Sequence, residues 1–316
     1  MFFTRVTRQL LCDISYTTRG VKIATRTHRA YAKAAKLHSG STVYCAVTHG
    51  TSLKMNSVLF HVILLAYLLA TVLLWLYLGL RHRTLFQLAN GLVLVGFGLQ
   101  TIALGAVILM QSEPWWPGAY ASMELLAWAL IVSYGAAWWY YRIEALGSFM
   151  VPLAFIAFAS SGLSTAARTP LSSVLQQFLL VLHIFLATLG YAALALTFCA
   201  GVMYLMQEHQ LKSKHPGILY HRLPSLRLLD ELNAQALVLG LPLLTQGVIT
   251  GSVWAKQVRG SYLNWSLTSV PLLLAWVLYA LLIGGRYMLG WQGRKAACAA
   301  VTGFLLVLAS YFVHTL

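Results

Sequence analysis

The chain has 316 residues, of which 59% are hydrophobic and only 9% are charged. A soluble domain carries roughly 25% charged residues, so this composition excludes a water-soluble globular protein and predicts an all-α, polytopic membrane protein. The formal net charge of +15 does not indicate nucleic-acid binding, because nine of the 22 Lys and Arg residues precede Asn56 and the others lie mainly in short loops between apolar runs.

The first 54 residues differ from the rest of the chain. They are rich in Arg, Thr and Ser, contain Asp13 as their only acid, and have no long apolar run. Three interpretations remain: a targeting-like segment, an extension upstream of a true start at Met55, or a disordered basic tail on anionic lipid. We therefore divide the chain into a basic extension, 1–54, and an integral-membrane domain, 55–316.

Eight apolar segments follow, and they predict about eight transmembrane helices, since a membrane span must satisfy its own backbone hydrogen bonds. The predicted spans are 57–79, 87–109, 121–141, 146–163, 175–206, 236–255, 268–286 and 296–313. Between the fifth and sixth, Leu223, Leu226, Leu229 and Leu232 recur at helical spacing and predict a short interfacial helix leading into the sixth span.

The basic residues of the loops predict the orientation. One set of alternate loops holds ten Lys and Arg residues, and the other set holds three. By the positive-inside rule the first set is cytoplasmic, so both ends of the core lie on the outer, periplasmic side of a bacterial inner membrane. The basic extension would then lie on the outer side, where the rule disfavours it, which favours a start at Met55 or removal of the tail.

Three histidines lie on the outer side: His61 and His183 in the outer parts of predicted spans, and His314 at the outer end of the eighth. Histidine at membrane depth is rare and suggests function, and imidazole is a good axial ligand for haem iron. The alternative is an interfacial histidine that is hydrogen-bonded to a neighbour. The sequence contains no cluster of Cys or carboxylate side chains that would form a zinc or calcium site instead.

An aromatic segment, "GSVWAKQVRGSYLNWSLTSVPLLLAW", joins the sixth and seventh spans on the outer side. Trp254, Tyr262 and Trp265 are typical of the aromatic belt of any membrane protein. They also fit a surface for a flat, apolar, anionic ligand, whose carboxylates Lys256 and Arg259 would neutralise.

The sequence resembles the cytochrome c assembly family, the CcsA/ResC-type membrane proteins and their HemX- and YpjD-type relatives. The similarity extends from about His61 to His314. It is carried by "LHIFLATLGYAALALTFCAGVMYLMQEHQLK", "RLPSLRLLDELNAQALVLGLPLLTQGVITGSVWA", "GWQGRKAACAAVTGFLLVLASYF" and "PGAYASMELLAWAL".

This resemblance implies handling of haem b at the outer face, where a tryptophan-rich segment, the WWD motif, presents it for thioether attachment to the CxxCH segment of an apocytochrome c. It also implies a ResB-like membrane subunit as a partner. Two outer histidines ligate the iron in such proteins. By position, His183 matches the first, His314 is the candidate for the second, and Trp254, Gly260, Tyr262 and Trp265 match the WWD region.

The sequence departs from the family pattern at several positions. Leu263 replaces a tryptophan, Ser266 an aspartate, and Gly284 falls where the family has an inner histidine. The primary hypothesis is a haem-binding assembly factor, and the departures keep open a HemX-like membrane regulator or scaffold of tetrapyrrole synthesis that no longer binds haem. A transporter is disfavoured because intramembrane acids are scarce. No nucleophile–base pair or phosphate loop is present, so we expect an assembly factor rather than an independent enzyme.

Overall fold

The computed structural model describes residues 57–110, 119–163, 174–213, 217, 222–262 and 269–315. Within these ranges, side chains are not described for residues 107–110, 119, 120, 163, 174, 259, 269 and 311–315. The predicted extension, 1–54, lies outside the described residues.

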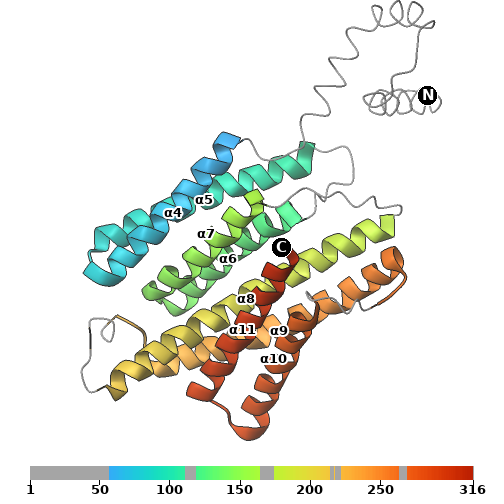
Figure 1. Cartoon of the computed structure of the whole chain (residues 1–316). Helices are drawn as coiled ribbons and strands as arrows, with labels where there is room; N and C mark the ends of the chain where they lie inside the picture. Colours follow the sequence, from blue (N-terminus) through green and yellow to red (C-terminus); the bar gives the residue numbers. More distant parts are fainter. Residues whose placement is uncertain are drawn as a thin grey trace, which may run out of the picture. The chain divides into compact units, whose positions relative to one another are not determined.

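The described residues form eight α-helices and one 3-10 helix, without a strand (Figure 1). They are α4 (Ser57–Leu80), α5 (Arg83–Met110), α6 (Ala119–Tyr141), η1 (Glu144–Leu146), α7 (Gly147–Leu163), α8 (Val174–Lys212), α9 (Leu226–Arg259), α10 (Ser269–Leu289) and α11 (Arg294–Thr315). Seven helical segments, α4 to α10, are long and apolar enough to cross a membrane, and α11 covers the eighth predicted segment. The predicted all-α, polytopic membrane fold is confirmed.

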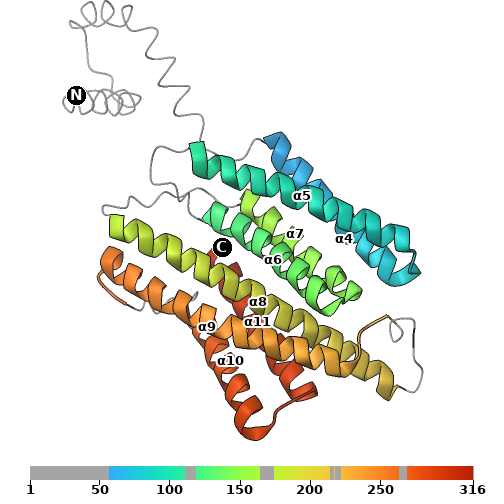
Figure 2. The same ribbon diagram turned by 180° about the vertical axis from the view of Figure 1, so that it is seen from behind.

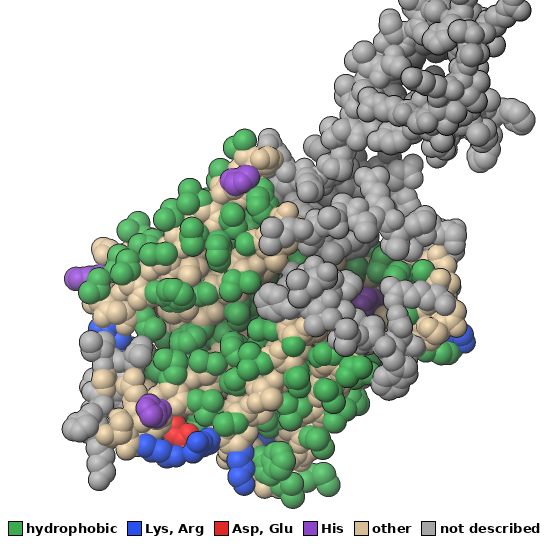
Figure 3. All heavy atoms as spheres, viewed as in Figure 1, with side chains coloured by type: hydrophobic (Ala, Val, Ile, Leu, Met, Phe, Trp, Pro, Cys, Tyr) green, Lys and Arg blue, Asp and Glu red, His purple; other side chains and the backbone are tan. Residues whose placement is uncertain are grey.

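Consecutive helices run in alternating directions, and the two opposite views agree on this (Figures 1 and 2). The short connections α4–α5, α6–α7 and α10–α11 lie at one end of the helix bundle, together with the end of α8 and the start of α9. We call it the basic end, because it carries Arg81, Arg83, Arg142, Arg222, Arg286 and Arg294. The opposite end is called the His183 end. Hydrophobic side chains cover the flank between the ends, as a lipid-facing surface requires (Figure 3).

Helix α9 is longer than predicted. The predicted interfacial helix before the sixth span was wrong as a separate element, because α9 begins at Leu226 and continues without a break to Arg259. Ser225 caps its start by accepting a hydrogen bond from the Leu228 N–H. Leu229 and Leu232 are buried in the bundle core, so the apolar stripe of this segment packs against protein rather than lipid.

Helices α8 and α9 pack with their backbones in close contact. A Cβ atom on Gly190 would lie 2.9 Å from the Leu244 nitrogen, and one on Gly247 would lie 3.1 Å from the Ala187 backbone. Small residues at such positions allow membrane helices to gain close van der Waals packing. Because α8 also contacts α6, α7 and α11, it holds the two halves of the bundle together.

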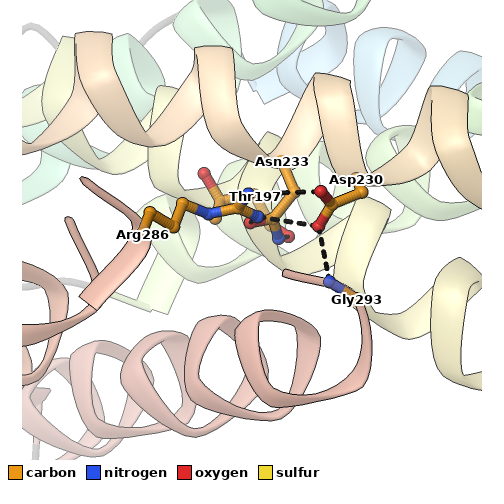
Figure 4. A network of polar contacts seen from close by, with 5 residues as sticks. All are labelled: Thr197, Asp230, Asn233, Arg286 and Gly293. Carbon is orange, nitrogen blue, oxygen red and sulfur yellow. Dashed lines mark hydrogen bonds and ion pairs between the residues drawn. The ribbon is translucent and has the colours of Figure 1, made fainter. Parts of the chain in front are cut away.

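A polar network connects four elements at the basic end (Figure 4). Arg286 of α10 donates to both carboxylate oxygens of Asp230 on α9, at 2.9 and 3.3 Å, and to Asn233 Oδ1 at 2.8 Å. Asp230 also accepts from the Gly293 N–H, and Asn233 Nδ2 donates to the Thr197 carbonyl of α8. The network therefore fixes α8, α9, α10 and the turn before α11 relative to one another.

Loss of either charge in this network should destabilise the protein. Arg286→Met leaves the Asp230 carboxylate without its cation, and we expect a cost of about 2–4 kcal/mol, somewhat below that of a fully buried pair. The pair is mostly shielded, with side-chain exposures of 11% and 22%. Thermal unfolding in detergent, followed by circular dichroism, measures the loss.

The double variant Asp230→Asn/Arg286→Met removes both charges and should lose less stability than the sum of the single variants. Lys212→Met is the control, since Lys212 forms an exposed pair with Glu208 and should contribute less than about 1 kcal/mol. Strict additivity of the two single losses would contradict the assigned ion pair.

Candidate functional site

His183 occupies the N-terminal part of α8 and is held against α9. Its Nδ1 lies 2.7 Å from the carbonyl oxygen of Gly247. A carbonyl oxygen only accepts hydrogen bonds, so Nδ1 carries the proton and donates it. In the neutral form of the imidazole, Nε2 is therefore the nitrogen whose lone pair faces a ligand.

Gly251, one turn beyond Gly247 on α9, makes room for the ring. A Cβ atom at this position would lie 2.6 Å from both Cε1 and Nδ1 of His183, far inside van der Waals contact. Only glycine therefore allows the imidazole to lie flat against α9 and reach the Gly247 carbonyl. The two glycines set the position of the ring and the nitrogen that donates to α9.

A cavity of about 490 Å³ opens beside His183. Residues from α6, α7, α8, α10 and α11 line it, and most of them are apolar, including Leu130, Leu153 and Phe304. Its volume is within the range of about 300–1,000 Å³ that small-molecule and cofactor sites occupy. The combination of an apolar wall and one neutral imidazole suits a large apolar ligand that carries its own metal ion.

The other predicted histidines differ in their relation to this cavity. His61 lies near the start of α4 at the same end, but its side chain is exposed and its Nδ1 contacts the Ser57 carbonyl of its own helix at 2.6 Å. It does not line the cavity, so the structure does not bring it together with His183. His314 lies in α11 one turn beyond Ser310, a lining residue, and its side chain is outside the described part of the chain.

The predicted aromatic and basic residues follow at the C-terminal end of α9. Trp254 is partly buried on the turn after Gly251. The Lys256 ammonium lies 4.1 Å from the centroid of the Tyr262 ring, a cation–π contact. Arg259 is the last residue of α9, which Gly260 ends in a left-handed conformation with φ 79°.

The central part of the predicted WWD counterpart, 263–268 with Trp265, lies outside the described residues. The side chain of Arg259 is also not described. Elsewhere, no group of three or more His, Cys, Asp and Glu side chains in the described ranges is arranged to hold a bare metal ion.

The roles of Gly247 and Gly251 were not predicted. Both belong to the quoted segment "LTQGVITGSVWA", and the spacing of four residues between them was the available signal. Small residues four apart predict a close helix contact. Their pairing with His183 depends on the register of two helices, which the sequence pattern does not specify.

Comparison with known proteins identifies relatives of similar sequence. The model of the family described as cytochrome C assembly protein matches residues 116–316. The chain is 29% identical over 216 residues to the cytochrome c biogenesis protein CcsA of Mesostigma viride, covering 61% of this chain and 71% of that protein. It is 26% identical over 306 residues to CcsA of Gloeobacter violaceus, covering 78% and 89% of the two chains.

CcsA of Parasynechococcus marenigrum is similar to the same extent, with 28% identity over 260 residues, 71% of this chain and 83% of that protein. The residues matched by the family model include α8 and α9, and so contain His183, Gly247 and Gly251. His61 precedes the matched residues. The chain therefore belongs to the cytochrome c assembly protein family.

Proposed function

We propose that, within cytochrome c assembly, this protein holds haem b through His183 at the His183 end of the bundle and presents it to an apocytochrome c. The hydrogen bond from His183 Nδ1 to the Gly247 carbonyl is the observation that carries the proposal, because it leaves Nε2 as an iron ligand beside an apolar cavity. The carbonyl also fixes the orientation of the imidazole ring, as outer-shell partners of metal-bound histidines do.

The cavity walls would exclude water from the porphyrin, while the propionates need cations. Lys256 and Arg259, at the C-terminal end of α9, are the cations nearest in sequence to Gly251 and supply positive charge at this end. His314, one turn beyond the lining residue Ser310, would be the second residue to hold the iron. Trp254, Tyr262 and Trp265 would provide the aromatic surface of the presenting segment.

Haem supplies the vinyl groups, and the apocytochrome supplies the thiols. Addition of each S–H across a vinyl double bond forms one C–S and one C–H bond, with no net oxidation. This chain would contribute iron ligation, orientation and exclusion of water. A ResB-like membrane subunit is the proposed partner in presenting the apocytochrome.

The charge distribution supports the orientation of the protein. The connections at the basic end hold most of the loop cations, so we infer that this end is cytoplasmic and that the His183 end faces the periplasm of a bacterial inner membrane. Haem would then be presented on the side where apocytochromes c are completed. A HemX-like regulator remains the second candidate, on the ground of Ser266 and Gly284, where the family has an acid and a histidine.

Loss of the His183 imidazole should remove haem. The wild-type protein, purified in detergent, is expected to show a Soret band, and His183→Ala should lower haem occupancy at least about tenfold, since even outer-shell losses cost about 10- to 100-fold. Added imidazole should restore part of the band, which a purely structural defect would not allow. His61→Ala is the matched control and should leave the spectrum unchanged.

A wild-type protein without haem, in membranes that contain it, would contradict the haem-holding function and favour the HemX-like regulator. If the spectrum of His183→Ala is identical to that of haem-containing wild type, His183 is excluded as the iron ligand, while the haem-holding function is not.

Gly251→Ala should displace the ring without removing it. The added methyl group would lie 2.6 Å from the imidazole, so the bond to Gly247 must lengthen or break. We expect about 10- to 100-fold weaker haem binding and a shifted Soret maximum. Haem titration followed by absorbance measures both changes.

Gly240→Ala on the same helix is the control for this substitution. Its methyl group would lie 3.0 Å or more from the Leu194 and Ala193 side chains, and these contacts do not involve the His183 ring. Equal haem affinities for both alanine variants would show that the contact between α9 and the His183 ring does not set the site.

A further inference from the structure

A second pocket, of about 230 Å³, lies at the basic end, away from His183. The ends of α4 and α6, the start of η1 and the residues before α9 surround it. Three arginines line it, Arg81, Arg142 and Arg222, together with a single carboxylate, Glu144. We call it the arginine pocket.

The positive charge of the arginine pocket is not neutralised within the described residues. The Glu144 carboxylate accepts a hydrogen bond from the Tyr77 hydroxyl and forms no ion pair with the described arginines. Arg222 donates to the Leu78 carbonyl, and the Arg142 guanidinium lies over the Trp138 ring at 5.3 Å. The pocket thus presents three cations against one anion to any ligand.

The backbone holds two of these arginines in a costly conformation. Arg81 has φ 60° and Arg142 has φ 56°, and each ends its helix with an N–H donated to the carbonyl four residues earlier. The left-handed region costs a residue with a Cβ roughly 1–2 kcal/mol, a cost that glycine avoids. Glycine would adopt this conformation at lower cost but would carry no charge. Arginine at both helix ends instead brings two positive side chains to one pocket.

An apolar groove continues from the arginine pocket. This groove, of about 1090 Å³, shares Tyr77, Arg81 and Glu144 with the pocket and extends between α5 and α6 as far as Phe97. From Arg83 to Phe97 a helix rises about 21 Å, more than the roughly 15 Å half-thickness of a bilayer's hydrocarbon core. Gly91 and Gly135 line it with open space above them.

We propose that the arginine pocket and this groove together bind one anionic glycerophospholipid. The phosphate would accept hydrogen bonds from Arg81, Arg142 and Arg222, and one acyl chain would lie along α5 and α6. Guanidinium groups suit phosphate oxygens, and basic pockets at the ends of membrane helices select anionic head groups. The inference is independent of haem binding and of the proposed function.

The test is the phospholipid content of the full-length protein, measured by native mass spectrometry after purification in mild detergent. Wild type should retain phosphatidylglycerol in preference to phosphatidylcholine. Arg81→Gly/Arg142→Gly should reduce retention about tenfold while the delipidated protein keeps or gains thermal stability, because glycine suits both backbone conformations. Arg227→Ala is the control, since Arg227 is exposed at the same end and does not line the pocket.

A second variant tests the groove. Gly91→Leu/Gly135→Leu should narrow it, because both glycines line the groove and a Cβ at either one meets no atom within 4 Å. Lipid retention should fall, and binding of inorganic phosphate, followed by thermal shift, should not change. Equal retention of phosphatidylcholine, no retention of lipid by wild type, or stabilisation by inorganic phosphate equal to that by the lipid would each overturn the proposal.

Discussion

The close approach of α8 and α9 is the constraint on which the candidate site depends. With glycine at 190 and 247, the two backbones come near enough for one side chain on α8 to reach a main-chain carbonyl of α9. A carbonyl within a helix is already occupied by its own hydrogen bond, yet it has a second lone pair that can accept from His183. The helix contact therefore determines which nitrogen of the imidazole is protonated.

The two ends of the bundle have different chemistry. At the basic end, charges are numerous and some are paired, as Arg286 and Asp230 are, so this end fixes the helices and sits at the polar surface of the bilayer. At the His183 end, an imidazole lies beside an apolar cavity, and Lys256 and Arg259 follow at the C-terminal end of α9. This division suits a protein that binds an apolar, metal-containing molecule at one face while its orientation is set at the other.

The helices could be predicted well from the sequence, because the bilayer leaves an apolar run of about 20 residues few other structures. The residues at which the helices end could not be predicted in the same way. α8 continues to Lys212 and α9 begins at Leu226, since polar residues at a membrane surface do not stop a helix. Hydropathy gives no signal for a helix end at these positions. The apolar stripe of Leu229 and Leu232 indicated an amphipathic helix, but not that the stripe packs against the bundle core.

The histidines illustrate the same limit at the site. Depth along a helix follows from counting residues, and it correctly grouped His61 with His183 at one end. Rotation about the helix axis depends on which neighbours pack, and it leaves His61 exposed on α4 while His183 lines the cavity. The carbonyl partner of His183 is 64 residues away in sequence, so only the packed structure reveals it.

The central claim is that His183, held by Gly247, ligates haem iron through Nε2. An electron cryomicroscopy map of the haem-loaded protein in a lipid nanodisc tests it most directly. The result expected is porphyrin density in the cavity, with the iron bonded to His183 Nε2 and Nδ1 still in contact with the Gly247 carbonyl. Haem bound elsewhere in the bundle, or iron bonded to other residues with His183 left free, would contradict it.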